Sequence, residues 1–91
     1  MLPSREQFER DALAEGFVEV YDRVWPPGKL VPTHSHPFPL KALVVEGEMW
    51  LTCRGVTHHL LPGGTFELDG NEPHEELYGE AGATYWVARR N

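Results

Sequence analysis

Three histidines have the residue type and spacing of a metal site. His34 and His36 flank Ser35 in an extended stretch, and His74 follows about forty residues later, between Pro73 and Glu75. Because side chains two residues apart in a strand point to the same face, the His-x-His pair could hold one metal ion. A pair of ligands with a remote third histidine is the arrangement of an open catalytic or binding metal site. The alternative is two ordinary histidines on the surface or in a turn.

Other side chains could act beside such a site. Glu76 stands two residues after His74 and shares its face if that strand is regular, so its carboxylate could orient an imidazole, and Glu67 is a second candidate for this role. His58 and His59 are adjacent, so only one of them can face inward. The sequence names no general base, and Glu76 and His58 are the candidates we consider; solvent-exposed strand residues are the alternative for both.

One short helix precedes the segments that would position these groups. Ser4 can cap a helix of about residues 4–15, Gln7 completes a capping-box pattern, and Gly16 supplies the left-handed stop that a helix end favours. From Phe17 to about residue 89 the pattern is one of short β runs separated by Pro- and Gly-rich turns.

We predict about seven or eight short strands, with turns at Glu46-Gly47, at Arg54-Gly55 and over residues 79–82. Strands at a spacing of about 8–12 residues are typical of an all-β sandwich or barrel. The sequence therefore predicts an all-β fold, a small antiparallel β-barrel or jelly roll with one N-terminal helix. We expect residues 1–91 to form a single domain.

Between Trp25 and Tyr78 the sequence resembles the cupin superfamily, in particular the small single-domain barrels of the cupin 2 type with an RmlC-like jelly roll. The first cupin motif is matched by Gly28, by His34-Ser-His36 five residues later, and by Gly47. The second motif is matched at its Pro62-Gly63 opening and its Pro73-His74 close. Asp69 and Asn71 replace the central Pro and Gly of that motif, and both still suit a turn.

The resemblance implies His34, His36 and His74 as metal ligands and departs from the family at a fourth. The metal-binding Glu of the family falls at Leu40, with Lys41 beside it, and neither side chain replaces a carboxylate. Three neutral imidazoles leave the charge of a divalent ion uncompensated and two or three positions open. Cupins with three histidine ligands include thiol dioxygenases and diketone-cleaving enzymes, whose substrate-binding residues are not recognisable here. A degenerate barrel with a vestigial site is the alternative.

A small ligand pocket could be lined by residues around the missing Glu and by aromatic strand residues. The candidates are Leu40, Lys41, Trp50, Phe66 and Tyr85. A barrel of this size is filled by its own side chains, so core packing is the alternative for the aromatic residues.

Charge and composition restrict the partners. Eight Lys and Arg residues against 14 Asp and Glu residues give a net charge of −6, which argues against nucleic acid or an anionic membrane as partner. The single Cys53, interpreted as a small buried apolar residue, permits no intrachain disulfide, and we expect a cytoplasmic protein. A small barrel exposes sheet edges, so a homodimer is expected, with the Phe17–Trp25 segment as the candidate pairing strand.

Two functions follow as hypotheses. The first is a metal-dependent enzyme, an oxygenase acting on a small polar substrate, with one divalent Fe, Mn, Ni, Cu or Zn ion held by the three histidines. The second is a non-enzymatic module that binds or senses a small molecule, with a vestigial or absent metal site. A purely structural role has no positive feature behind it.

Overall fold

The computed structural model describes residues 2–91 as one helix followed by six strands of a single antiparallel sheet. The elements are α1 (Arg5–Ala14), β1 (Glu19–Trp25), β2 (Leu30–His34), β3 (Leu40–Cys53), β4 (Val56–Leu60), β5 (Thr65–Leu68) and β6 (His74–Arg89). The predicted all-β fold with one N-terminal helix is confirmed. No helix in residues 2–91 is long and apolar enough to cross a membrane.

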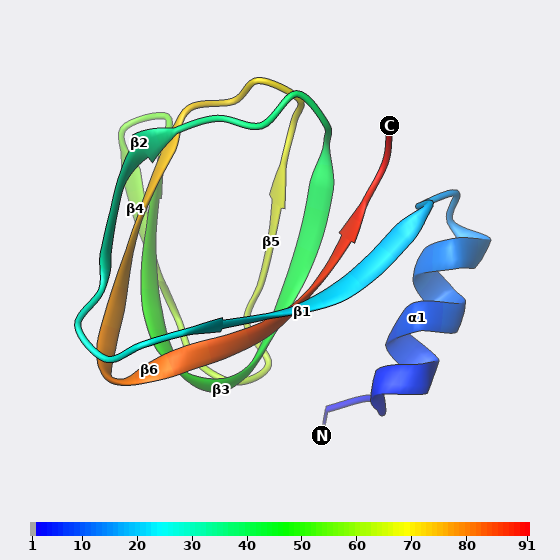
Figure 1. Cartoon of the computed structure of the whole chain (residues 1–91), viewed down its shortest axis with the longest axis horizontal. Helices are drawn as coiled ribbons and strands as arrows, with labels where there is room; N and C mark the ends of the chain where they lie inside the picture. Colours follow the sequence, from blue (N-terminus) through cyan, green and yellow to red (C-terminus); the bar gives the residue numbers. More distant parts are fainter. Residues whose placement is uncertain (1) are drawn as a thin grey trace.

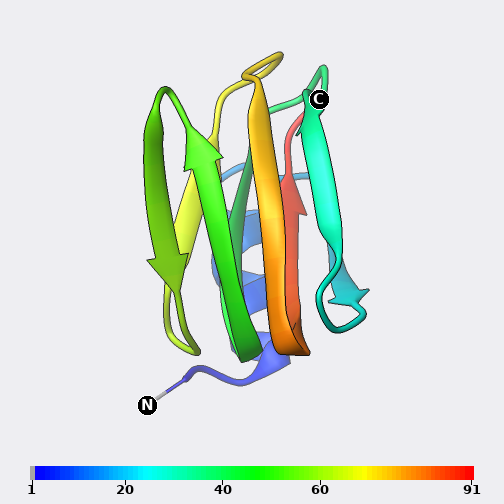
Figure 2. The same cartoon turned by 90° about the vertical axis from the view of Figure 1, so that its left-hand side faces the viewer.

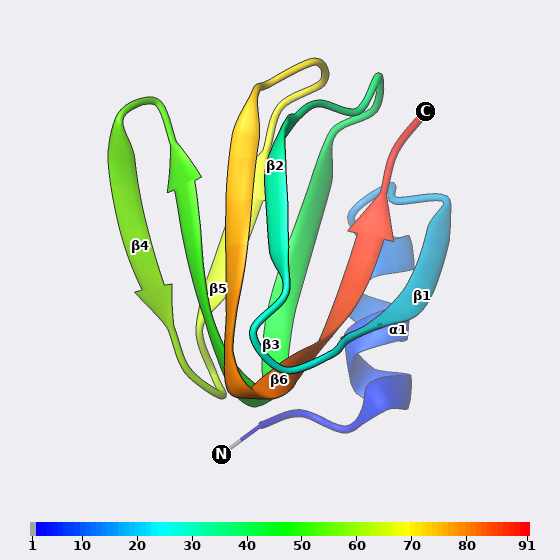
Figure 3. The ribbon, with the colours of Figure 1, turned by 60° about the vertical axis from the view of Figure 1, so that its left-hand side comes forward.

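Two long strands, β3 and β6, pair with each other along most of their length and fold the sheet into two layers. In one layer the first half of β3 pairs with β5, and the last half of β6 pairs with β1. In the other layer the second half of β3 pairs with β4, and the first half of β6 pairs with β2. Figure 2 shows this second layer face on, and Figure 3 shows both layers obliquely.

Glycines allow both long strands to bend where the two layers meet. Gly47 and Gly82 have positive φ angles of 79° and 71°. A Cβ at Gly47 would overlap the carbonyl oxygen of Gly82, and one at Gly82 would overlap that of Trp25. The sheet therefore turns its corner through close backbone contacts that only glycine permits.

This bend corrects two sequence predictions. Glu46-Gly47 is not a turn between strands, because it is an irregularity within β3, and residues 79–82 lie inside β6. The chain has six strands instead of the seven or eight predicted, since two pairs of predicted strands merge and β2 was not predicted as a separate strand. The hairpin at Arg54-Gly55 is confirmed, with φ angles of 54° and 76°.

Alternating side chains give β3 and β6 two apolar faces. Val44 and Tyr85 belong to the core between the layers, whereas Leu43 and Ala88 face the other way, toward α1. The helix packs Phe8 and Ala12 against this outer face, and Figure 1 shows it outside the barrel. Ser4 caps the helix by accepting a hydrogen bond from the backbone N–H of Gln7, as the sequence predicts.

Candidate metal centre

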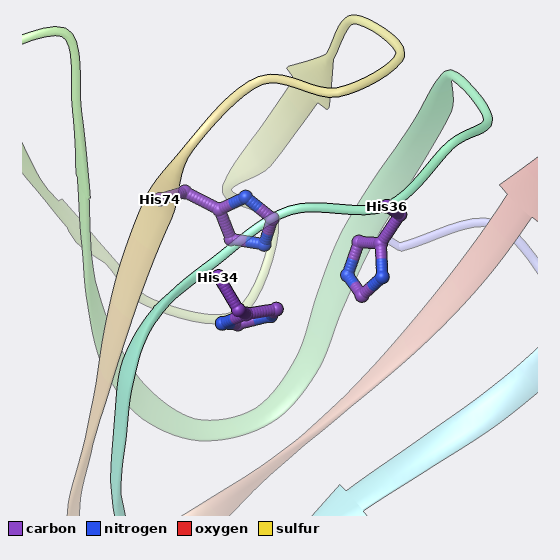
Figure 4. A group of neighbouring side chains, drawn as sticks. All are labelled: His34, His36 and His74. Carbon is purple, nitrogen blue, oxygen red and sulfur yellow. The ribbon is translucent and has the colours of Figure 1, made fainter.

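The structure brings the three histidines together at one end of the barrel. His34 is the last residue of β2, His36 lies in the loop that follows, and His74 is the first residue of β6. His34 and His74 are partners in the ladder between these strands. One ring nitrogen from each of the three residues lies within 4.8 Å of the others, and Figure 4 shows the rings converging.

Hydrogen bonds to the backbone orient two of these rings. Nδ1 of His34 lies 2.8 Å from the carbonyl oxygen of Pro32, and Nδ1 of His74 lies 2.9 Å from that of Glu72. Because a carbonyl oxygen only accepts, each Nδ1 donates its proton. In the neutral ring Nε2 then keeps a free lone pair, which is the state that a metal-binding imidazole needs.

The third ring, His36, is biased toward its neutral form. Burial lowers the pKa of His36, and the neighbouring rings of His34 and His74 lower it further. The cavity lined by the three histidines has a volume of about 40 Å³, which is enough for an ion and a water molecule. Three neutral imidazoles around a small polar cavity fit a divalent transition-metal ion.

A buried carboxylate completes the floor of this cavity. Glu76 is 4% exposed and points to the same face of β6 as His74. Its Oε1 accepts hydrogen bonds from the hydroxyls of Tyr78 and Tyr85, the latter at 3.0 Å. Nε1 of Trp25 donates in turn to the Tyr85 hydroxyl at 3.1 Å. The sequence indicated Glu76, but it did not indicate the two phenols that hold it.

The two tyrosines remain protonated far into the alkaline range. Burial and the negative charge of Glu76 raise the pKa of Tyr85 to about 12. The pKa of Tyr78 is raised well above its ordinary value, mainly by burial. Both hydroxyls are therefore proton donors to the carboxylate at neutral pH.

Two further residues that line the cavity were not predicted from the sequence. Tyr21 and Arg23, which alternate along β1, line the same cavity as the histidines. Because Asp22 stands between them in β1, Tyr21 and Arg23 could be predicted to share one face of a strand. Which face of β1 meets the histidines, however, depends on how β1 pairs with β6. Among the described residues that line this cavity, Arg23 is the single Lys or Arg.

The five residues proposed for a ligand pocket divide into two groups. Leu40, Phe66 and Tyr85 line the cavity with the histidines. Lys41 follows Leu40 in β3 and therefore faces outward, where its ammonium binds Glu15 at 2.7 Å. Trp50 also lies away from the histidines, since its ring stacks on His59 across the β3–β4 ladder. Neither Lys41 nor Trp50 borders the histidine cavity.

The remaining candidates lie apart from this centre. His58 borders an open groove of about 880 Å³, which shares Phe66 and Leu68 with the histidine cavity but includes none of the three clustered histidines. His59 faces the opposite way and binds Glu48 at 2.6 Å. Cys53 is buried, as expected, and burial raises the pKa of its thiol.

Comparisons with known proteins find this fold in solved structures. DMSP lyase DddQ from Ruegeria pomeroyi is 23% identical, with a TM-score of 0.73, over 79% of this chain and 37% of its own. An RmlC-like cupin from Shewanella frigidimarina is 20% identical, with a TM-score of 0.71, over 82% of this chain and 68% of its own. No protein-family model and no curated protein matches the sequence.

A regulatory protein contains a similar domain. The Cupin_2 domain of an XRE family transcriptional regulator from Enterobacter cloacae is 18% identical, with a TM-score of 0.65, over 79% of both chains. The chain spans just over a third of the length of the lyase and most of this regulator domain.

Proposed function

The chain is a small cupin by its fold, and from this premise we propose that His34, His36 and His74 bind one divalent transition-metal ion. The observation that carries the proposal is the convergence of three ring nitrogens, two of them on rings whose Nδ1 is engaged by a backbone carbonyl. Imidazole ligands suit Zn, Cu, Fe and Ni, and Mn remains a candidate.

We further propose that the protein is a metal-dependent enzyme acting on a small polar substrate. A bound ion would supply Lewis-acid polarisation of a substrate oxygen and, if it is iron, the chemistry of an oxygenase. The residues of the chain orient the imidazoles of His34 and His74 through backbone carbonyls and give the cavity an apolar wall through Leu40 and Phe66.

The substrate would bind at the rim, because about 40 Å³ admits an ion and a water molecule but no organic molecule. At the rim, the guanidinium of Arg23 and the hydroxyl of Tyr21 are the polar groups that favour a substrate with an anionic part. This preference makes small carboxylates the first substrates to screen.

Elemental mass spectrometry of untagged protein tests the metal proposal. We expect about one metal ion per chain in the wild type and a loss of most of it in His34→Ala and His74→Ala. His58→Ala is the matched control, because this exposed histidine lies in a different groove and should leave the metal content unchanged. A wild type that stays empty after reconstitution with each metal, with its fold intact, would refute the proposal.

A ligand-binding role without catalysis is the second candidate. The likeness to the cupin domain of a transcriptional regulator, which extends over 79% of both chains, favours it. Thermal denaturation with a panel of small molecules separates the two. A ligand that stabilises the protein equally with metal present or chelated would support the binding role, whereas stabilisation only with metal would support the enzyme.

We also propose a homodimer through β1. This strand pairs with β6 on one side, and its Val24 is 74% exposed. An unpaired strand edge with exposed apolar side chains favours pairing with a second copy. Light scattering should give about twice the mass of the chain, and a monomer at high concentration would contradict the proposal.

A further inference from the structure

Glu76 is a buried carboxylate whose two oxygens have different surroundings. It lies on β6, is 4% exposed, and borders the cavity of the three histidines. Taking a carboxylate out of water costs several kcal/mol unless partners compensate its charge. The contacts of each oxygen therefore indicate which partners compensate the charge.

One oxygen is hydrogen-bonded to two protein groups. Oε1 accepts hydrogen bonds from the hydroxyls of Tyr78 and Tyr85. Both tyrosines are buried, so their positions are set by core packing. The two phenols fix the orientation of the carboxylate and leave its second oxygen directed at the histidines.

The second oxygen faces two imidazole nitrogens that have no proton to offer in the neutral rings. Oε2 lies 3.4 Å from Nε2 of His34 and 3.7 Å from Nε2 of His74. When these rings are neutral with Nδ1 donating to the backbone carbonyl, the Nε2 atoms carry lone pairs. Three atoms with lone pairs thus point toward one another, an arrangement that a cation between them would stabilise.

The distances match a shared metal ion better than a hydrogen bond. Both separations exceed the roughly 2.7–3.2 Å of an N–H···O bond. Two ligands that bind one ion at about 2.0–2.2 Å lie about 2.8–3.6 Å apart for angles between 90° and tetrahedral, so the 3.4 Å separation from His34 falls within this range and the 3.7 Å separation from His74 lies just above it. The carboxylate therefore lies close to the position of a ligand that shares an ion with His34 and His74, and a small shift of its side chain would complete the contact.

We propose that Glu76 is the anionic ligand of the metal centre. It comes from β6, whereas the cupin motif would have a carboxylate at position 40, on β3. This inference rests on the proposed metal site. Leu40 on β3 and Glu76 on β6 border the same cavity. A carboxylate on β6 can therefore enter the cavity that a carboxylate at position 40 would have entered. Tyr78 and Tyr85 act as positioning residues, and the carboxylate reduces the net charge of a divalent site from +2 to +1.

Metal affinity of the Glu76→Gln variant tests the proposal. Glutamine keeps the size of the side chain and an oxygen that accepts from the tyrosines, but it removes the charge. Competition with a chromogenic chelator for Co²⁺ should show affinity at least tenfold weaker than in the wild type, with altered visible absorption bands of the bound Co²⁺. Glu75→Gln is the matched control, because it removes the same charge from the neighbouring position, on the other face of β6.

The outcomes separate this inference from the metal site itself. Wild-type protein that binds Co²⁺ while Glu76→Gln binds it equally tightly, with the same spectrum, would overturn the role of Glu76 and leave the three-histidine site intact. Wild-type protein that binds no metal would overturn both. An infrared difference spectrum of the wild type with and without metal needs no variant: a shifted carboxylate band supports the ligand role, and an unchanged carboxylate region refutes it.

Discussion

The hydroxyl of Tyr78 should contribute measurably to the stability of the fold through its bond to Glu76. Tyr78 is 1% exposed, and its ring stacks on Trp25 with a centroid distance of 5.3 Å. Its hydroxyl donates to Oε1 of Glu76 and lies 3.2 Å from the hydroxyl of Tyr85. Tyr78→Phe keeps the ring and its stacking, so the change removes the hydroxyl alone.

The expected loss follows from the charge of the acceptor. A hydrogen bond to a charged group contributes about 1.5–3 kcal/mol, and its removal leaves the buried carboxylate with Tyr85 as its remaining phenol donor. We therefore expect Tyr78→Phe to lower the free energy of unfolding by about 2 kcal/mol. For a domain of this size, 1 kcal/mol corresponds to about 4–8 °C, so the melting temperature should fall by about 8–16 °C.

Urea denaturation of metal-free protein, followed by tryptophan fluorescence and circular dichroism at neutral pH, measures this loss. Tyr21→Phe is the matched control, because Tyr21 is half-buried and no hydrogen bond of its hydroxyl is found within residues 2–91. It should change the stability by less than about 0.5 kcal/mol. Equal stability changes in the two variants would refute the idea that Tyr78 holds a charged Glu76.

Two further predictions concern the bend and the alkaline limit of the fold. Gly82→Ala should lower the free energy of unfolding by more than about 3 kcal/mol, because the added Cβ would overlap the carbonyl oxygen of Trp25. Gly28→Ala should lower it by about 1–2 kcal/mol, because Gly28 also has a positive φ but has open space around it. Urea denaturation of both variants measures the two losses, and equal losses would contradict the prediction. In metal-free protein, the raised pKa of Tyr85 stabilises the fold fully below about pH 10, the ordinary tyrosine value, and this contribution is lost as the pH rises through about 12. The phenolate absorbance of the folded protein should therefore appear at a higher pH than that of the protein unfolded in urea. Identical titration curves for the two states would refute the burial argument.

Local patterns were enough to predict the helix and the alternation of side chains between the two faces of each strand. Ser4 and Gly16 delimit the helix through capping chemistry, which acts within a few residues. The period of two residues in a strand predicted that Glu76 shares a face with His74. These features depend on neighbours along the chain, so they can be predicted from the sequence.

The strand count and the limits of the pocket depended on contacts between distant segments. Gly47 is typical of a turn, but here it lies beside Gly82 and lets β3 continue around the corner. Lys41 follows the position of the missing carboxylate in the motif, yet it faces α1 and binds Glu15. The sequence shows that adjacent residues face opposite ways, but which face becomes the interior is decided by strand pairing.

The sequence by itself determined which groups are available for chemistry: three histidines, one nearby carboxylate and no carboxylate at position 40. Only the tertiary structure decided that Tyr78 and Tyr85 fix one oxygen of Glu76 and that its other oxygen faces His34 and His74. The physical reason is that a buried charge depends on partners a few ångströms away in space, and strand register brings these partners together from segments far apart in the chain.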